Sequence, residues 1–261
     1  MNKIVMGIAG LVAFGIAAPA SAADLSARPY TKAPPMIAAA AYDWSGFYIG
    51  GNGGYGTSSK CWDLINNGFG FIPAISEGCH DATGAIAGGQ IGYRWQSAAW
   101  VFGLEAQGDW ANLRGFNQTF PGFNNNTKVE AFGLFTGQIG YAWNNALLYV
   151  KGGAAVVSDK YRGTTSVIVG ASPIGTVFDN ASETRWGGTV GVGAEYGFTP
   201  NWSFAVEYDH IFMGNRNVSF TSTGAANNPL GLSRIDVIRQ DVDIVTARLN
   251  YRFGGPVVAR Y

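Results

Sequence analysis

Apolar and polar residues alternate along most of the chain after residue 43. Between Trp100 and Trp110, every second residue is apolar or glycine, and the residues between them are polar or small. A period of two is typical of a β-strand with one face in an apolar environment. The same pattern recurs in seven other segments. The predicted strands are 44–56, 83–96, 100–110, 129–143, 147–156, 185–198, 202–212 and 245–253.

The charged residues of these strands fall on one parity. The opposite parity holds almost only apolar residues and glycine, which suits contact with lipid. The charges on the polar parity are Arg94, Glu105, Asp109, Glu130, Lys151, Glu195, Glu207, Asp209, Arg248 and Arg252.

The connections between the predicted strands alternate in length. Those at 96–99, 144–146 and 199–201 are tight, and those around 57–82, 112–127, 158–184 and 213–237 are long and polar. Each strand is long enough for a tilted span of about 9–11 residues. The sequence therefore predicts an all-β protein, an eight-stranded antiparallel up-and-down transmembrane β-barrel. In that class the short turns face the periplasm.

The N-terminal region predicts export. Lys3 is followed by an uncharged apolar run to Ala18, then by Pro19 and a small-x-small site ending at Ala22. This pattern is typical of a signal peptide (1–22) cleaved after Ala22 or the next residue. Residues 23–42 are a Pro- and Ala-rich segment that we interpret as a flexible periplasmic lead-in. Residues 43–261 form the predicted barrel.

Composition supports a partly lipidic environment. Charged residues make up 13% of the chain, against roughly 25% in soluble domains, while aromatic residues make up 14% and glycine contributes 38 of 261 residues. Basic and acidic residues balance at 17 each, so nothing indicates nucleic-acid binding. Beyond the signal peptide, no apolar run is long enough for a transmembrane helix.

One segment imitates a dinucleotide-binding loop. Residues 51–56 fit the spacing G-x-G-x-x-G, but a phosphate loop must open a helix. No helical period follows Gly56, and the period of two continues through the glycines. We interpret these glycines as part of a strand, where they permit curvature or close backbone approach.

The two cysteines, Cys61 and Cys79, predict one disulfide in an exported chain. Free thiols are the alternative. A metal site formed by both cysteines with His80 lacks a fourth ligand. We predict no metal site and no cofactor.

An eight-stranded barrel has an interior that is about filled by side chains. Charges in so narrow a space should pair, because an unpaired buried charge is costly. We therefore predict a plugged lumen, with a narrow polar pore as the alternative. The predicted lumen charge network is Arg94, Glu105, Lys151, Glu195, Glu207, Arg248 and Arg252.

Most tryptophans lie near strand ends, where girdles of aromatic residues anchor barrels at the lipid head groups. A packed soluble core is the alternative interpretation. The predicted interfacial residues are Trp44, Trp95, Trp100, Trp110, Trp143, Trp186 and Trp202.

The segment Tyr-Asp-Trp-Ser-Gly-Phe-Tyr-Ile-Gly at 42–50 resembles the opening strand of the small outer-membrane immunogenic proteins, or porins, of α-proteobacteria. The ending Leu-Asn-Tyr-Arg-Phe-Gly at 249–254 resembles their last strand. The resemblance implies an eight-stranded barrel in the outer membrane of a Gram-negative bacterium. It also implies an abundant surface antigen, sometimes a porin or a haem binder. The terminal aromatic used in assembly is Phe253 or Tyr261.

The resulting functional hypothesis is a structural, surface-exposed envelope barrel. Its expected partners are outer-membrane lipid and, during biogenesis, periplasmic chaperones and the barrel-assembly machinery. Narrow solute permeation and binding of haem, phage or host surfaces through the long loops are the alternatives. Catalysis is not expected, because His210 beside Asp209 has no evident nucleophile.

Overall fold

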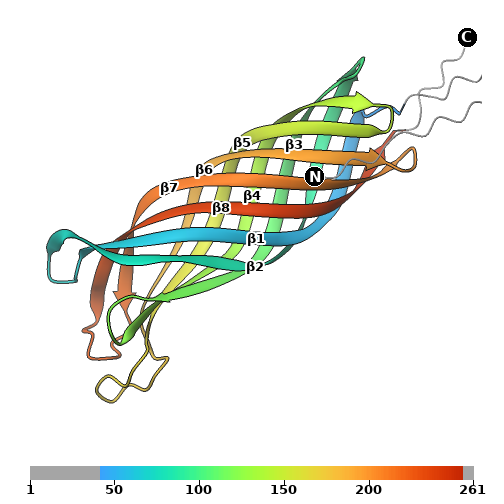
Figure 1. Cartoon of the computed structure of the whole chain (residues 1–261). Coiled ribbons are helices and arrows are strands. Elements are labelled where there is room, and N and C mark those ends of the chain that lie inside the picture. The colour runs from blue at the N-terminus through green and yellow to red at the C-terminus, as the bar shows by residue number, and fades with distance from the viewer. Residues whose placement is uncertain (1–41, 255–261) are drawn as a thin grey trace, which may run out of the picture. The chain divides into compact units, whose positions relative to one another are not determined.

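The structure, a computed structural model, describes residues 42–254 and confirms the predicted fold class. Eight antiparallel strands follow one another around a ring, and β8 pairs with β1 to close the barrel (Figure 1). The strands are β1 (Gly46–Asn66), β2 (Phe71–Ser97), β3 (Trp100–Gln118), β4 (Phe123–Trp143), β5 (Ala146–Thr165), β6 (Val177–Gly197), β7 (Trp202–Ser222) and β8 (Gly231–Phe253).

Several predicted features lie outside the described residues. These are the signal peptide (1–22) with its cleavage site at Ala22, the lead-in up to residue 41, and Tyr261. Phe253 ends β8, where it pairs with Phe47 of β1.

The prediction of long polar loops is wrong, because the strands continue through most of those residues. The connections at that end span only residues 67–70, 119–122, 166–176 and 223–230. The tight turns predicted at the other end are present between β2 and β3, β4 and β5, and β6 and β7. We call residues 57–83, 112–130, 158–184 and 214–243, that is, the outer portions of the strands together with the connections between them, the outer extension.

The alternation persists in the outer extension, but its outward face becomes polar and its interior holds both apolar and charged side chains. Nearer the tight turns, apolar side chains such as Leu104 and Val206 face outward and Glu105 faces inward. In the outer extension, Trp62 and Phe220 are buried inside, while polar side chains face outward. The change on the outward face follows from the surroundings, since lipid favours apolar outward groups and water favours polar ones.

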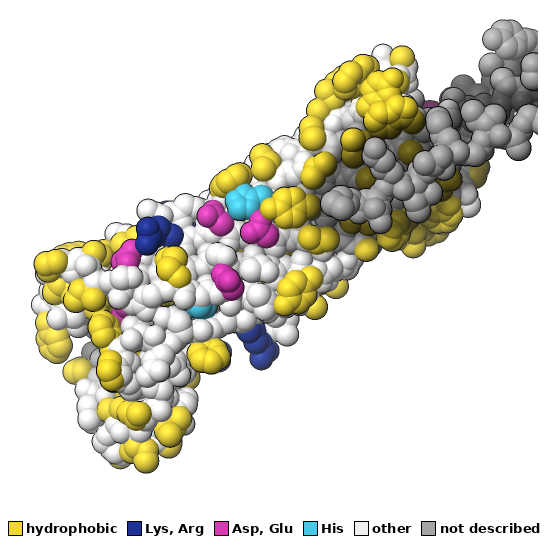
Figure 2. Space-filling view, viewed as in Figure 1, with side chains coloured by type: hydrophobic (Ala, Val, Ile, Leu, Met, Phe, Trp, Pro, Cys, Tyr) yellow, Lys and Arg dark blue, Asp and Glu magenta, His cyan; other side chains and the backbone are white. Residues whose placement is uncertain are grey.

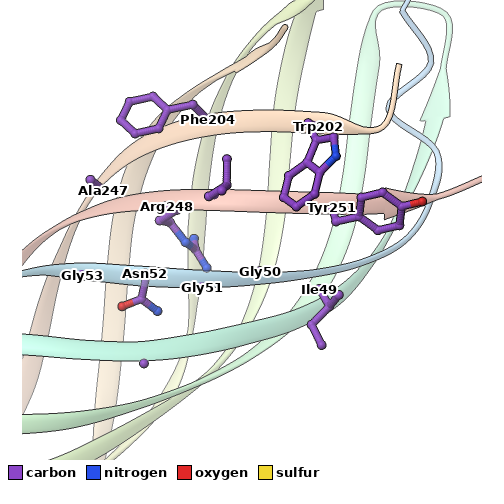
Figure 3. A pocket seen from close by; sticks show the side chains of 12 residues that line it. Ile49, Gly50, Gly51, Asn52, Gly53, Trp202, Phe204, Ala247, Arg248 and Tyr251 are labelled. Carbon is purple, nitrogen blue, oxygen red and sulfur yellow. The ribbon is translucent and has the colours of Figure 1, made fainter. Parts of the chain in front are cut away.

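The outward apolar side chains nearer the tight turns form an apolar belt. On β3 it runs from Trp100 through Leu104 to Trp110, and on β8 from Phe253 to Val245. A shallow groove of about 680 Å³ crosses the belt where small residues, including Gly51, Gly53 and Ala247, face outward (Figure 3). Within residues 42–254, no helix is long and apolar enough to cross a bilayer.

Six of the seven tryptophans predicted at the interfaces are outward-facing and exposed: Trp95, Trp100, Trp110, Trp143, Trp186 and Trp202. The prediction for Trp44 is wrong, because it is 1% exposed. Trp44 precedes β1 and packs inside the barrel mouth against Val101, Leu147 and Tyr149. Its ring Nε1 donates a hydrogen bond to the Asn144 carbonyl at 3.3 Å.

The lumen is filled by layers that differ in polarity, and the inward residues of β8 run through all of them. Arg252, Asn250 and Arg248 are polar, Ile244 and Val242 are apolar, Gln240 is polar, Ile238 is apolar, and Asp236 and Arg234 are charged. An apolar layer therefore separates two charged regions of the interior.

Candidate functional site

The charged layer nearest the tight turns is centred on two cations. The Nζ atom of Lys151 lies 2.6 Å from a Glu207 oxygen, 3.2 Å from Asp209 and 3.5 Å from Glu105. The guanidinium of Arg248 lies 2.7 Å from Glu105 and also pairs with Glu207. All five side chains are almost fully buried. The cations and carboxylates thus neutralise one another inside the barrel.

A second pair, Arg94 and Glu195, lies beside this cluster, with 2.8 Å between Arg94 Nη2 and Glu195 Oε2. The two groups are connected through uncharged side chains. Arg94 donates to Gln138 at 3.4 Å, and Gln138 donates to the Tyr48 hydroxyl at 3.1 Å. Tyr48 in turn donates to Glu105 at 2.6 Å.

Two tyrosine–glutamate contacts occupy equivalent places in the two halves of the barrel. Tyr48 on β1 donates to Glu105 on β3, and Tyr149 on β5 donates to Glu207 on β7 at 2.7 Å. Each tyrosine ring lies over a glycine of the neighbouring strand, Gly92 or Gly193, where an added methyl group would overlap the ring. The glycines therefore allow each tyrosine to reach its carboxylate.

Six of the seven residues predicted for the lumen charge network lie in these two groups, but the prediction for Arg252 is wrong. Its guanidinium donates to the carbonyls of Ser45 at 2.9 Å and Pro200 at 2.7 Å. Arg252 is near the end of β8, so it reaches backbone carbonyls at the barrel mouth and has no carboxylate partner among residues 42–254.

The inward assignment of Glu130 is also wrong. The β4–β5 register shifts between Val129 and Ala131, so Glu130 occupies a bulge and faces outward. It pairs with Lys128 at 2.9 Å and Lys160 at 2.8 Å. A bulge of this kind breaks the alternation on which the sequence assignment depended.

Sequence reasoning missed the apolar layer above the charges. It consists of residues from six strands, and many of them have no exposed surface. Its members are Ala82, Ile86, Ala111, Leu113, Val129, Phe132, Leu134, Ala155, Val157, Ile211, Met213, Val242 and Ile244. Their inward parity was a usable signal, but polar inward residues were expected throughout.

Two further ionic groups fill the outer extension. Lys60 lies 2.6 Å from Asp159, and Arg185 donates to the Tyr161 hydroxyl at 2.7 Å. Nearer the tips, Arg234 is shared among three carboxylates, Glu77 at 2.8 Å, Asp179 at 3.0 Å and Asp236 at 3.4 Å. A hydrophobic cluster of Trp62, Tyr161, Val218, Phe220 and Ile238 lies between them.

The surplus of acids around Arg234 predicts an unusual pH dependence. Burial raises the pKa of Asp236 to about 8. The unfolded carboxyl ionises near pH 4, so this group's contribution to stability is greatest below pH 4 and is lost as pH rises towards 8.

We therefore expect Asp236→Asn to raise the free energy of unfolding at pH 8.5 by roughly 1–3 kcal/mol, because the amide cannot ionise. The gain should shrink towards pH 4. Urea unfolding in detergent across this pH range measures it, with Asp63→Asn as the control, because Asp63 is partly exposed and pairs with the exposed Arg239. A gain that does not vary with pH would contradict the assignment.

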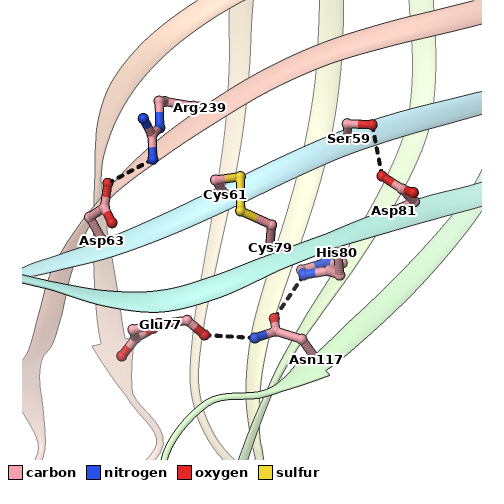
Figure 4. Close-up of a disulfide and its surroundings, with 9 residues drawn as sticks. All are labelled: Ser59, Cys61, Asp63, Glu77, Cys79, His80, Asp81, Asn117 and Arg239. Carbon is pink, nitrogen blue, oxygen red and sulfur yellow. Dashed lines mark hydrogen bonds and ion pairs between the residues drawn. A yellow bond between two sulfur atoms is a disulfide. The ribbon is translucent and has the colours of Figure 1, made fainter.

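The predicted disulfide between Cys61 and Cys79 is confirmed, and it joins register partners on β1 and β2 (Figure 4). The two Cα atoms are 4.1 Å apart. The bond therefore crosslinks two strands of the outer extension and does not tie down a loop.

We expect the double variant Cys61→Ser, Cys79→Ser to lose up to about 3 kcal/mol of unfolding free energy, the chain-entropy value for a closed loop of this size. The closed barrel should persist, because β1 and β2 remain paired on both sides of the bond. Urea unfolding and the gel mobility of unheated samples measure both effects. Failure of the variant to form a barrel would show that the bond is required for folding.

Both histidines are engaged in hydrogen bonds. The ring nitrogens of His80 lie 2.8 Å from Asn117 Oδ1 and 3.0 Å from Thr127 Oγ1. His210 is on β7, and its Nδ1 lies 2.7 Å from Asp243, which also accepts from Tyr208 at 2.6 Å. Asp209, the expected neighbour of His210, points into the lumen.

Comparison with known proteins places these features in context. The profile of the family described as "Outer membrane protein beta-barrel domain" matches residues 8–253. The chain is 30% identical over 198 residues to a 31 kDa outer-membrane immunogenic protein of Brucella melitensis, covering 72% of this chain and 78% of that protein. It is also 30% identical over 181 residues to a 22 kDa outer membrane protein of Rhizobium leguminosarum, covering 69% of each.

Among solved structures, the outer membrane protein OprG of Pseudomonas aeruginosa is similar with 12% sequence identity and a TM-score of 0.44. The match covers 82% of this chain and 99% of that chain.

Proposed function

The chain belongs to the outer membrane protein beta-barrel domain family and is located in the outer membrane, and on that premise we propose that it is a structural, surface-exposed barrel with a lumen closed to ions. The apolar layer carries this proposal. At its level, Leu113, Leu134, Val157, Ile211 and Val242 have no solvent-accessible surface. An ion crossing this layer would lose its hydration without gaining a polar partner.

The charged layer below supports the same proposal. Lys151 and Arg248 are held directly by carboxylates, so their charges are not directed towards a water-filled path. Breaking such buried pairs is costly, and the arrangement therefore favours a rigid interior over a gate.

Planar-bilayer recording of the purified mature chain tests the closed lumen. We expect no stable unitary conductance steps under a moderate applied voltage. The combined variant Leu113→Ser, Leu134→Ser, Ile211→Ser provides a matched comparison, because it replaces apolar-layer groups with groups that water can hydrate. Large, stable steps from the unmodified protein would refute the proposal, and they would support the narrow-porin alternative.

One observation favours a second role in surface recognition. The tips of the outer hairpins carry exposed apolar side chains, including Phe69, Phe71, Ile168, Ile174 and Leu230. Figure 2 shows hydrophobic groups gathered at this end of the barrel. Exposed apolar groups on adjacent hairpins are typical of binding surfaces.

Haem titration distinguishes a haem-binding tip from other recognition. Phe116 and Phe120 are exposed near the β3–β4 tip, so Phe116→Ser with Phe120→Ser should weaken haem binding if this tip holds the porphyrin. Equal binding by the variant and the unmodified chain would exclude that tip as the haem site.

Biogenesis partners follow from the location in the outer membrane. We propose that periplasmic chaperones and the barrel-assembly machinery handle the chain before it contacts lipid. Phe253 is exposed at the end of β8, at the barrel end that holds the tight turns. This position suits a terminal assembly signal.

A further inference from the structure

A cluster of cations lies on the outward face of β3, β4 and β5 in the outer extension. Register pairing places Arg114 opposite Lys128, and Lys128 opposite Lys160. Arg162 follows Lys160 by two residues on the same face of β5. Three neighbouring strands therefore present four cations side by side on the outside of the barrel.

These side chains line a groove of about 540 Å³, which also includes Phe116 and Asn126. Glu130 is the one carboxylate in its lining. Its two oxygens lie 2.9 Å from Lys128 Nζ and 2.8 Å from Lys160 Nζ, so it holds both ammonium groups at the groove. Four cations against one carboxylate leave an excess of three positive charges.

The two arginines are available to a ligand. Arg114 is exposed, and its Nε donates to Asn112 at 2.9 Å. Arg162 is also exposed, two residues beyond Lys160 on β5. Within the described residues, neither guanidinium has a carboxylate within 4.0 Å. Planar guanidinium groups in this state suit bidentate contacts with phosphate or carboxylate oxygens.

The position of the groove relative to the apolar belt indicates which region of the membrane it faces. Arg114 comes four residues after Trp110, where the apolar belt ends on β3, and Lys160 comes four residues after Val156, the last outward apolar residue of β5. Four strand residues span about 13 Å along the strand. The groove thus lies just beyond the hydrocarbon, at the level of lipid head groups, and on the side away from the tight turns.

Outward-facing carboxylates occur on the strands beside and opposite the groove. Asp81 on β2 and Asp241 and Asp243 on β8 are outward-facing. Figure 2 shows acidic side chains beside a histidine on the face formed by β1, β7 and β8. The exposed cations on β7 and β8, Arg216 and Arg239, are each paired with an acid, so the excess of positive charge is at the groove on β3, β4 and β5.

We propose that this cationic groove binds the anionic head group of an outer-leaflet glycolipid, with the acyl chains lying along the belt below it. Short turns of this class of barrel face the periplasm, so the groove faces the outer leaflet. Clusters of Lys and Arg at a membrane surface attract anionic head groups. A glycolipid satisfies both requirements, since its phosphates lie at the groove while its chains contact residues such as Phe135 and Val156.

Native mass spectrometry of the refolded mature chain, titrated with diphosphorylated lipid A in detergent, tests the proposal. The main variant combines Arg114→Gln, Lys128→Gln, Lys160→Gln and Arg162→Gln. The control combines Arg216→Gln and Arg239→Gln, which remove exposed, acid-paired cations from β7 and β8. Gel mobility of unheated samples verifies that each barrel is closed.

We expect the four-site variant to lose affinity by at least about tenfold, and the control to remain within about twofold. Removing the phosphates from the glycolipid should produce a similar loss with the unmodified chain and little further loss with the variant. Glu130→Gln should increase the affinity, because it removes the opposing charge; a merely structural role for Glu130 would not produce this sign.

The proposal would be overturned by unchanged affinity in the four-site variant, by equal affinity for the dephosphorylated glycolipid, or by reduced affinity in Glu130→Gln. Displacement of the glycolipid by an equimolar amount of inorganic phosphate would also overturn it, since it would indicate a site for free phosphate.

Discussion

Replacing Arg248 with methionine lowers the free energy of unfolding by about 3–5 kcal/mol, the cost of leaving one partner of a buried ion pair uncompensated. Arg248 contacts both Glu105 and Glu207, and its side chain is 1% exposed. Its loss leaves Glu105, Glu207 and Asp209 to Lys151 alone. The expected result is a large shift of the urea unfolding curve in detergent.

The matched control is Arg239→Met on the same strand. Arg239 pairs with Asp63 at 3.3 Å and is exposed, so its removal should change stability by no more than about 1 kcal/mol. Adding Glu105→Gln to Arg248→Met should restore part of the lost stability, because one uncompensated carboxylate disappears. If the two arginine variants are equally stable, the charge pairing inside the barrel does not contribute to folding.

Gly193→Ala is expected to cost about 1–3 kcal/mol, the usual range for an overpacked site. The added methyl group overlaps the ring of Tyr149, which must move away from β6. That movement lengthens the 2.7 Å hydrogen bond from Tyr149 to Glu207 and disturbs the partner shared by Lys151 and Arg248. Thermal or urea unfolding of refolded protein measures the loss.

Gly108→Ala is the natural comparison, because Gly108 faces outward and nothing lies within 4 Å of an added methyl group. Its effect should stay within about 0.5 kcal/mol. In a Tyr149→Leu background the penalty at Gly193 should largely disappear, since the tyrosine ring is no longer present. An equal penalty at Gly108 and Gly193 would mean that backbone propensity, and not ring packing, makes glycine necessary.

The eight strands and the pairing of charges inside the barrel were predictable from local patterns. A strand spanning lipid must turn an apolar face outward, so a period of two along residues 100–110 or 202–212 identifies both the strand and its lipid-facing side. Glu105, Lys151, Glu207 and Arg248 follow from that parity, because the opposite face of each strand can only point into the lumen.

The errors occurred where the surroundings of the strand change. Beyond the belt, water replaces lipid, and the outward residues become polar while Trp62 and Tyr161 fill the interior. A polar stretch with small residues then resembles a loop, although its alternation continues. Trp44 and Arg252 were misassigned for a related reason, since both lie at the barrel mouth, where side chains reach across strands that are distant in sequence.

The sequence by itself determined which residues share a face, because alternation along a strand is a local property of the backbone. Tertiary structure decided which of those residues meet, since contacts such as Arg248 with Glu105 join β8 to β3 across the closed ring. Strand register also decided that Glu130 faces outward at a bulge, and that cations from β3, β4 and β5 gather in one groove. These outcomes depend on strand register and on distances across the barrel, which a linear pattern does not contain.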